Sequence, residues 1–139
     1  MVNKVETRKL TFRKELFGVQ FQYYLCEETG AEFTDEGMEM ANINQVYNRY
    51  RDKYGIPLPE EIIGIRKKYG LAASEMSAIL GFGANEYRNY EVGEIPSISK
   101  GRLNQLAKSP IELKKLLLLS KNTIGEFSIK KANSKIEQV

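Results

Sequence analysis

Two short apolar patterns that meet at Gly81 constrain the fold of this chain more than any other feature. Apolar residues recur at helical spacing on both sides of the glycine, at Met76, Ile79, Leu80, Tyr87 and Tyr90. A residue without Cβ adopts a positive φ at little cost, so Gly81 suits a sharp reversal between two helices. We therefore expect two short helices whose apolar edges share one core.

The second of these helices would carry a polar face opposite its tyrosines. Asn85, Arg88 and Asn89 are spaced i, i+3 and i+4, which puts them on one side of a helix. In the major groove of DNA, arginine pairs bidentately with guanine and asparagine with adenine. The pattern predicts a DNA-binding helix-turn-helix whose second helix, residues 83–92, enters the major groove. The alternative is a face that is only solvated.

Charge adds further candidate contacts to DNA. The net charge is +3, and residues 59–108 carry 7 Lys and Arg against 6 Asp and Glu. Residues 1–58 carry 8 basic against 9 acidic residues, so the front of the chain is a poor independent binder of nucleic acid. Contacts to phosphates must then come from individual residues near the motif. The predicted DNA-binding residues are Asn85, Arg88, Asn89, Ala84, Ser74, Arg66 and Lys100.

Residues before, within and after the two helices match a longer motif. It is filled by Leu71, Glu75, Met76, Leu80, Gly81, Tyr87, Tyr90, Glu91, Gly93 and Pro96. This motif resembles the phage-repressor (Xre/Cro-like) helix-turn-helix family, and the resemblance implies a mostly helical, lambda-repressor-like domain. Two positions depart from the family: Ala73 stands where a glutamine often bonds a DNA phosphate, and Ser77 stands where members have alanine.

The front of the chain predicts a small β unit followed by a long helix. β-branched and aromatic residues favour strands over Thr7–Lys14 and Val19–Cys26, with Gly18 at the turn of a hairpin. Residues 34–36, Thr-Asp-Glu, then offer an N-cap and acids for the first turn of a helix. Residues 55–57, Gly-Ile-Pro, would end that helix.

The remaining chain is expected to be helical. Further helices are predicted to begin near Pro59 and Ser97 and to cover Ile111 to Leu119. Beyond Asn122 the polar, Lys-rich run has little periodicity, so we expect a flexible tail. The predicted fold class is α+β, with a β-hairpin unit and connecting helix, a helix-turn-helix domain, and a tail. These parts are residues 1–57, 58–121 and 122–139.

A second resemblance involves the β unit. Residues 24–30 read Tyr-Leu-Cys-Glu-Glu-Thr-Gly. Together with the helix-turn-helix, this segment is similar to MqsA-like (YgiT-type) antitoxins, in which four cysteine thiolates of the β unit hold zinc. Here Thr29 stands at a cysteine position, Cys26 is the single cysteine, and the chain has no histidine. One thiol cannot build a tetrahedral zinc site, so we expect a relative without metal or cofactor.

Two further segments occur together in a narrower group. Residues 44–57 and 81–91 resemble helix-turn-helix antitoxins from mobile elements of gut bacteria. Longer members of that group carry a C-terminal Panacea domain, so this chain is interpreted as a truncated or a naturally short form. The resemblance implies the antitoxin and autorepressor of a type II toxin–antitoxin operon. Its expected partners are double-stranded operator DNA, a second copy of the chain and a cognate toxin.

Other functions are also consistent with the sequence. The helix-turn-helix could be a scaffold in a protein-interaction adaptor whose hairpin or Tyr47–Tyr54 helix binds a partner. A solitary phage-type repressor without a toxin is also consistent with the pattern. An enzyme is not expected, because the chain has no histidine and no nucleophile paired with a base. The lone cysteine indicates a reducing cytoplasm, and no apolar run is long enough for a signal sequence or membrane span.

Overall fold

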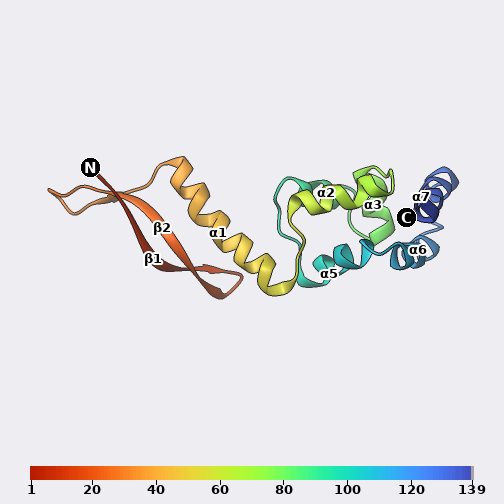
Figure 1. Ribbon diagram of the computed structural model, residues 1–139, viewed down its shortest axis with the longest axis horizontal. Coiled ribbons are helices and arrows are strands. Elements are labelled where there is room, and N and C mark those ends of the chain that lie inside the picture. Colours follow the sequence, from red (N-terminus) through yellow and green to blue (C-terminus); the bar gives the residue numbers. More distant parts are fainter. Residues whose placement is uncertain (139) are drawn as a thin grey trace. The chain divides into compact units, whose positions relative to one another are not determined.

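The computed structural model describes residues 1–138 and shows an α+β fold, in which a three-stranded antiparallel sheet precedes the helices (Figure 1). The chain divides into two compact units, residues 1–53 and 54–139. Val139, the last residue of the expected tail, lies outside the described residues. None of the helices within residues 1–138 is long and apolar enough to cross a membrane.

The N-terminal unit is a β-hairpin with a third short strand and a long helix that runs beside the hairpin (Figure 1). Its elements are β1 (Val2–Phe12), β2 (Glu15–Leu25), β3 (Glu32–Phe33) and α1 (Glu36–Tyr54). The strands pair in the order β1-β2-β3, and β1 pairs with β2 along its whole length. Alternate residues of β2 are buried at Phe17, Val19 and Tyr23, as expected for a sheet with one covered face.

The hairpin turn lies at Arg13 and Lys14, so its predicted position at Gly18 was wrong. Gly18 is inside β2, opposite Lys9. A two-residue hairpin turn of type I′, which follows the twist of the strands, has positive φ at both central positions, and here φ is 51° at Arg13 and 68° at Lys14. Non-glycine residues adopt this conformation at a cost. Arg13 gains contacts in return, because its Nη1 donates to the Tyr50 hydroxyl at 3.2 Å and its guanidinium lies over that ring.

Helix α1 begins and ends at the residues that the sequence indicates. The Asp35 carboxylate accepts a hydrogen bond from the Met38 N–H at 2.7 Å, and Gly55 has a φ of 66° just after the helix. The Tyr50 ring is 4% exposed and packs edge-on against Phe12 and Phe17. Tyr50 therefore belongs to the core of the N-terminal unit and is not available as a partner surface.

The C-terminal unit is made of helices. They are α2 (Pro59–Lys68), α3 (Ala73–Leu80), α4 (Glu86–Glu91), α5 (Ile98–Ala107), α6 (Pro110–Leu119) and α7 (Glu126–Gln138). Pro59 occupies the first turn of α2, and Ser97 caps α5 by accepting from the Lys100 N–H. The core draws on all six of these helices and on the loop after α2, with Tyr69, Met76, Tyr87, Leu113 and Ala132 at 0% exposure.

Helix α7 occupies most of the segment that was expected to be a flexible tail. Its Ala132 is fully buried in the core. The Lys131 ammonium lies 3.1 Å from a carboxylate oxygen of Glu75 on α3, and the Ser128 hydroxyl donates to the same carboxylate. Ile129, Ala132 and Ile136 recur at helical spacing, so the segment carries an amphipathic pattern that the sequence prediction missed.

Candidate nucleic-acid interface

The two central helices, α3 and α4, are joined by a turn at the glycine that the sequence singles out. Gly81 follows α3 directly and has a φ of 76°, and the Phe82 N–H bonds back to the Ser77 carbonyl at 2.7 Å. Helix α4 begins at Glu86, so it is shorter than the predicted 83–92. The preceding residues form the turn, and Asn85 is the N-cap.

The inner side of α4 is fixed by its two tyrosines. Tyr87 is fully buried and Tyr90 is 4% exposed, as predicted for a shared core. The Tyr87 hydroxyl donates to the Ile62 carbonyl of α2, and its backbone N–H donates to Ser77 Oγ of α3 at 3.1 Å. Burial raises the pKa of Tyr87, with a further contribution from the nearby Glu91 carboxylate. This side of α4 is therefore held by both preceding helices.

The N-terminal end of α4 is organised around Glu86. Its carboxylate accepts from the Gly83 N–H at 3.0 Å and from the Tyr90 hydroxyl at 2.9 Å, and it pairs with the Lys100 ammonium at 2.6 Å. The hydrogen bond from Lys100, then those from Gly83 and Tyr90, lower the pKa of Glu86 to about 2. Sequence reasoning missed this role. The available signals were an acid in the first turn of a helix and a tyrosine four residues later.

The C-terminal end of α4 is held by an ion pair between Arg66 of α2 and Glu91. The two side chains are 25% and 10% exposed. Arg66 and Lys100, both predicted to contact DNA, are thus brought to opposite ends of α4 and each is paired with a carboxylate of that helix. Their observed contacts position α4.

The outer side of α4 has no such contacts. Asn85, Arg88 and Asn89 are exposed, and none of the three side chains has a hydrogen-bond or ion-pair partner among residues 1–138. Ala84 in the turn and Ser74 in the first turn of α3 are exposed as well. Five of the seven predicted DNA-binding residues are therefore accessible on α3, α4 and the turn between them.

Helix α4 thus carries exposed hydrogen-bonding side chains on a backbone that is held in place. Two amides and one guanidinium project from a helix whose opposite side and both ends are anchored. The backbone of an anchored helix loses little conformational freedom when the side chains that it carries bind a ligand. Within residues 1–138, no three or more His, Cys, Asp or Glu side chains lie close enough together to hold a metal ion.

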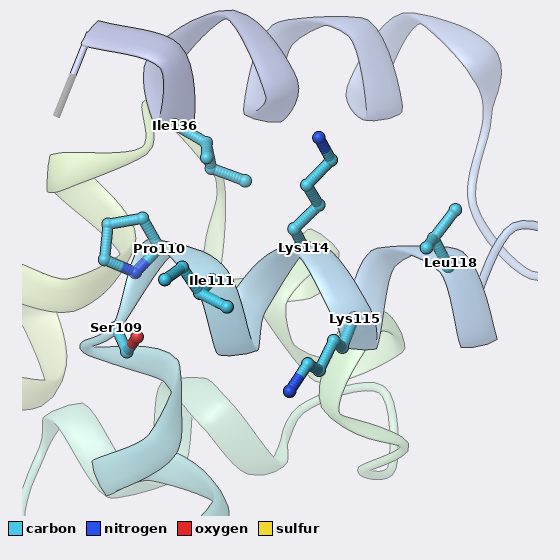
Figure 2. Close-up of a pocket in the computed structure, with 7 residues that line it drawn as sticks. All are labelled: Ser109, Pro110, Ile111, Lys114, Lys115, Leu118 and Ile136. Atoms are coloured by element: carbon cyan, nitrogen blue, oxygen red, sulfur yellow. The ribbon is translucent and has the colours of Figure 1, made fainter.

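A second surface feature lies on the last two helices. A groove of about 590 Å³ is lined by Pro110, Ile111, Lys114 and Leu118 of α6 and by Ile136 of α7, together with Ser109 and Lys115 (Figure 2). The Ile111 and Leu118 side chains are 70% and 65% exposed. None of the predicted DNA-binding residues lines this groove.

Comparison of the chain with known protein-family models finds no match, and comparison with curated proteins finds no significant match.

Proposed function

We propose that α3 and α4 form a helix-turn-helix and that the chain binds double-stranded DNA in a sequence-specific manner. The observation that carries this proposal is the asymmetry of α4. Its tyrosines are buried and both ends are ion-paired, while Asn85, Arg88 and Asn89 are exposed without partners in the described chain. These are side chains that read guanine and adenine in the major groove.

The biological role that fits this binding is autorepression by an antitoxin. The support is the resemblance of residues 44–57 and 81–91 to helix-turn-helix antitoxins. A homodimer would place two copies of α4 in successive major grooves of a palindromic operator. The half-sites would then lie about one helical turn, or a multiple of it, apart.

DNA binding is tested by fluorescence anisotropy with the DNA upstream of the chain's own gene, and with scrambled DNA as competitor. We expect specific binding to exceed scrambled binding by a factor of roughly a thousand or more. The double variant Asn85→Ala/Arg88→Ala should lose this preference, because both base-reading groups are removed. Weak binding that scrambled DNA matches would overturn the proposal.

A matched control variant loses the same two residue types, and therefore the same charge, as the α4 double variant. Asn44→Ala/Arg49→Ala removes one amide and one guanidinium from exposed positions of α1. This variant should retain the preference for operator DNA, since any effect of net charge alone is the same in both double variants. Equal losses in both would show that α4 does not read the sequence.

The antitoxin role has its own test. The gene next to this chain is expressed alone and together with it, and growth is recorded. We expect the neighbour's product to arrest growth alone and the arrest to be relieved by co-expression. A harmless neighbour with intact operator binding would leave a solitary repressor as the function.

A further inference from the structure

The two long edges of the N-terminal sheet differ in whether their outward-facing backbone groups are hydrogen-bonded within residues 1–138. On the outer edge of β2, the Gln22 N–H donates to Asn42 Oδ1 at 2.9 Å, and Asn42 Nδ2 donates back to the Gln22 carbonyl at 3.1 Å. Gln45 makes the same pair of bonds with the backbone of Gln20, at 2.8 and 2.9 Å. Two amide side chains of α1 thus take the place of a neighbouring strand.

These bonds also establish which backbone groups of β1 point outward. Gln20 and Gln22 lie opposite Thr7 and Val5 in the antiparallel pair. Since the two β2 residues direct their N–H and C=O groups away from β1, their partners must direct theirs away from β2. By the alternation of the ladder, the outward-facing backbone groups of β1 belong to Asn3, Val5, Thr7, Lys9 and Thr11.

No other backbone or side-chain group within residues 1–138 bonds to this outer row of β1. The strand is 11 residues long and contains no proline. Folded proteins usually shorten, interrupt or cover such an edge, because its unpaired groups can pair with another strand. The fold covers the edge of β2 and leaves that of β1 open.

We propose that the open edge of β1 pairs antiparallel with β1 of a second copy of this chain, centred on Thr7. The pairing joins the two three-stranded sheets into one. The sequence of the strand selects the occupant, because this register is self-complementary over all of Val2–Phe12. It places Glu6 opposite Arg8 of the second copy, twice in each dimer, and places no like charges directly opposite each other.

Neighbouring registers are less favourable. Hydrogen bonds form between the two β1 strands only where residues with outward-facing backbone groups lie opposite each other. The nearest other registers that satisfy this condition are centred one residue away, at Glu6 or at Arg8. A centre at Glu6 would put two carboxylates opposite each other, and a centre at Arg8 would put two guanidinium groups opposite each other. Like charges directly opposite in a sheet are destabilising, and opposite charges are stabilising. The Glu6 and Arg8 side chains are 47% and 29% exposed and pair with each other within one chain, where Arg8 also pairs with Glu32 of β3. Pairing across the edge would add a second carboxylate–guanidinium contact to this cluster.

This inference assigns the dimer contact that the proposed function leaves open, but it does not rest on DNA binding. The oligomeric state is measured without DNA, so the dimer and the recognition face of α4 can fail separately.

The first experiment removes the outward N–H at the centre of the edge. Thr7→Pro deletes a donor that points away from β2, and proline is tolerated on an edge strand at such a position. Sedimentation equilibrium over a wide concentration range should give a wild-type dimer and a Thr7→Pro dimer that is weaker by about tenfold or more, because both central hydrogen bonds are lost. Thr7→Ala keeps the N–H and should dimerise like the wild type.

The second experiment exchanges charges and does not depend on a single variant folding well. Glu6→Arg and Arg8→Glu alone should each weaken the dimer, because each creates like-charge pairs across the edge. An equimolar mixture of the two variants should form a heterodimer, since Glu and Arg then face each other again. A monomeric wild type, or a dimer that Thr7→Pro and both charge variants leave unchanged, would overturn the proposal, as would a mixture that shows no recovery.

Discussion

Ser77 Oγ accepts a hydrogen bond from the backbone N–H of Tyr87 at 3.1 Å, so a side chain of α3 caps the first turn of α4. Both residues are buried, at 1% and 0% exposure. The N-cap residue of α4, Asn85, makes no capping bond with its own side chain. The cap that a helix ordinarily receives from its own N-cap residue is therefore supplied here by the neighbouring helix, and Asn85 keeps its amide free.

Replacing Ser77 by alanine should lower the free energy of unfolding by roughly 1–3 kcal/mol, because a buried N–H loses its acceptor. Chemical denaturation measures this change. Ser74→Ala is the matched control, since Ser74 is exposed on the same helix, and its effect should stay within about 0.5 kcal/mol. Equal stability of the two variants would show that the Ser77 hydroxyl is not a cap.

Arg66→Gln should also destabilise the C-terminal unit, by about 1–3 kcal/mol. It leaves the Glu91 carboxylate, 10% exposed, without its cation, and the partial exposure of Arg66 reduces the cost below that of a fully buried pair. Thermal or chemical unfolding provides the measurement. Arg102→Gln removes the same charge from an exposed position of α5 and should change stability little. A loss of the same size in both variants would contradict a specific role for the pair.

Glu86 should make stability fall in acid. Its pKa is lowered to about 2 in the folded chain, so its contribution is fully present above about pH 4.5 and is lost as the pH falls toward 2. Unfolding measured across this range should show a smaller loss for Glu86→Gln, which cannot titrate. Glu137→Gln, at an exposed position of α7, should follow the wild-type profile. Identical pH profiles for wild type and Glu86→Gln would exclude the predicted linkage.

The features that the sequence predicted correctly depend on the conformational preference of single residues or on spacing within one helix. The N-cap at Asp35, the proline at the start of α2 and the left-handed turn at Gly81 each follow from one residue type at one position. The burial of Tyr87 and Tyr90 follows from helical spacing. The α+β class follows from combining these signals along the chain.

The features that the sequence did not predict depend on contacts between distant residues. The hairpin turns at Arg13 and Lys14, where Arg13 lies against Tyr50, and no local signal at either residue favours positive φ. Helix α7 is held through Glu75 of α3. The sequence shows Lys100 only as a cation near the motif, and its ion pair with Glu86 becomes visible in the fold. Partners of this kind are far apart in sequence and no spacing rule connects them.

Two helical glycines should respond oppositely to alanine. A Cβ at Gly101 of α5 would lie 2.7 Å from Cγ1 of Ile56, so Gly101→Ala should destabilise by about 1–3 kcal/mol. A Cβ at Gly64 of α2 meets nothing within 4 Å, so Gly64→Ala should stabilise by about 0.5–1 kcal/mol through helix propensity. Shifts in the denaturation midpoint give both values. A stabilising Gly101→Ala would mean that α5 does not pack against Ile56 as described.

Arg88→Lys separates base recognition from charge on the outer face of α4. Lysine keeps the positive charge but lacks the planar fork that bonds two acceptors of guanine at once. The ratio of operator to scrambled-DNA affinity should fall by roughly 5- to 150-fold, while binding to scrambled DNA and its salt dependence stay nearly unchanged. Anisotropy titrations at two salt concentrations measure both quantities. Arg88 is exposed and has no partner in the described chain, so stability should not change. If the ratio of operator to scrambled-DNA affinity stayed unchanged, Arg88 would not read a base, and sequence reading would rest on the two asparagines.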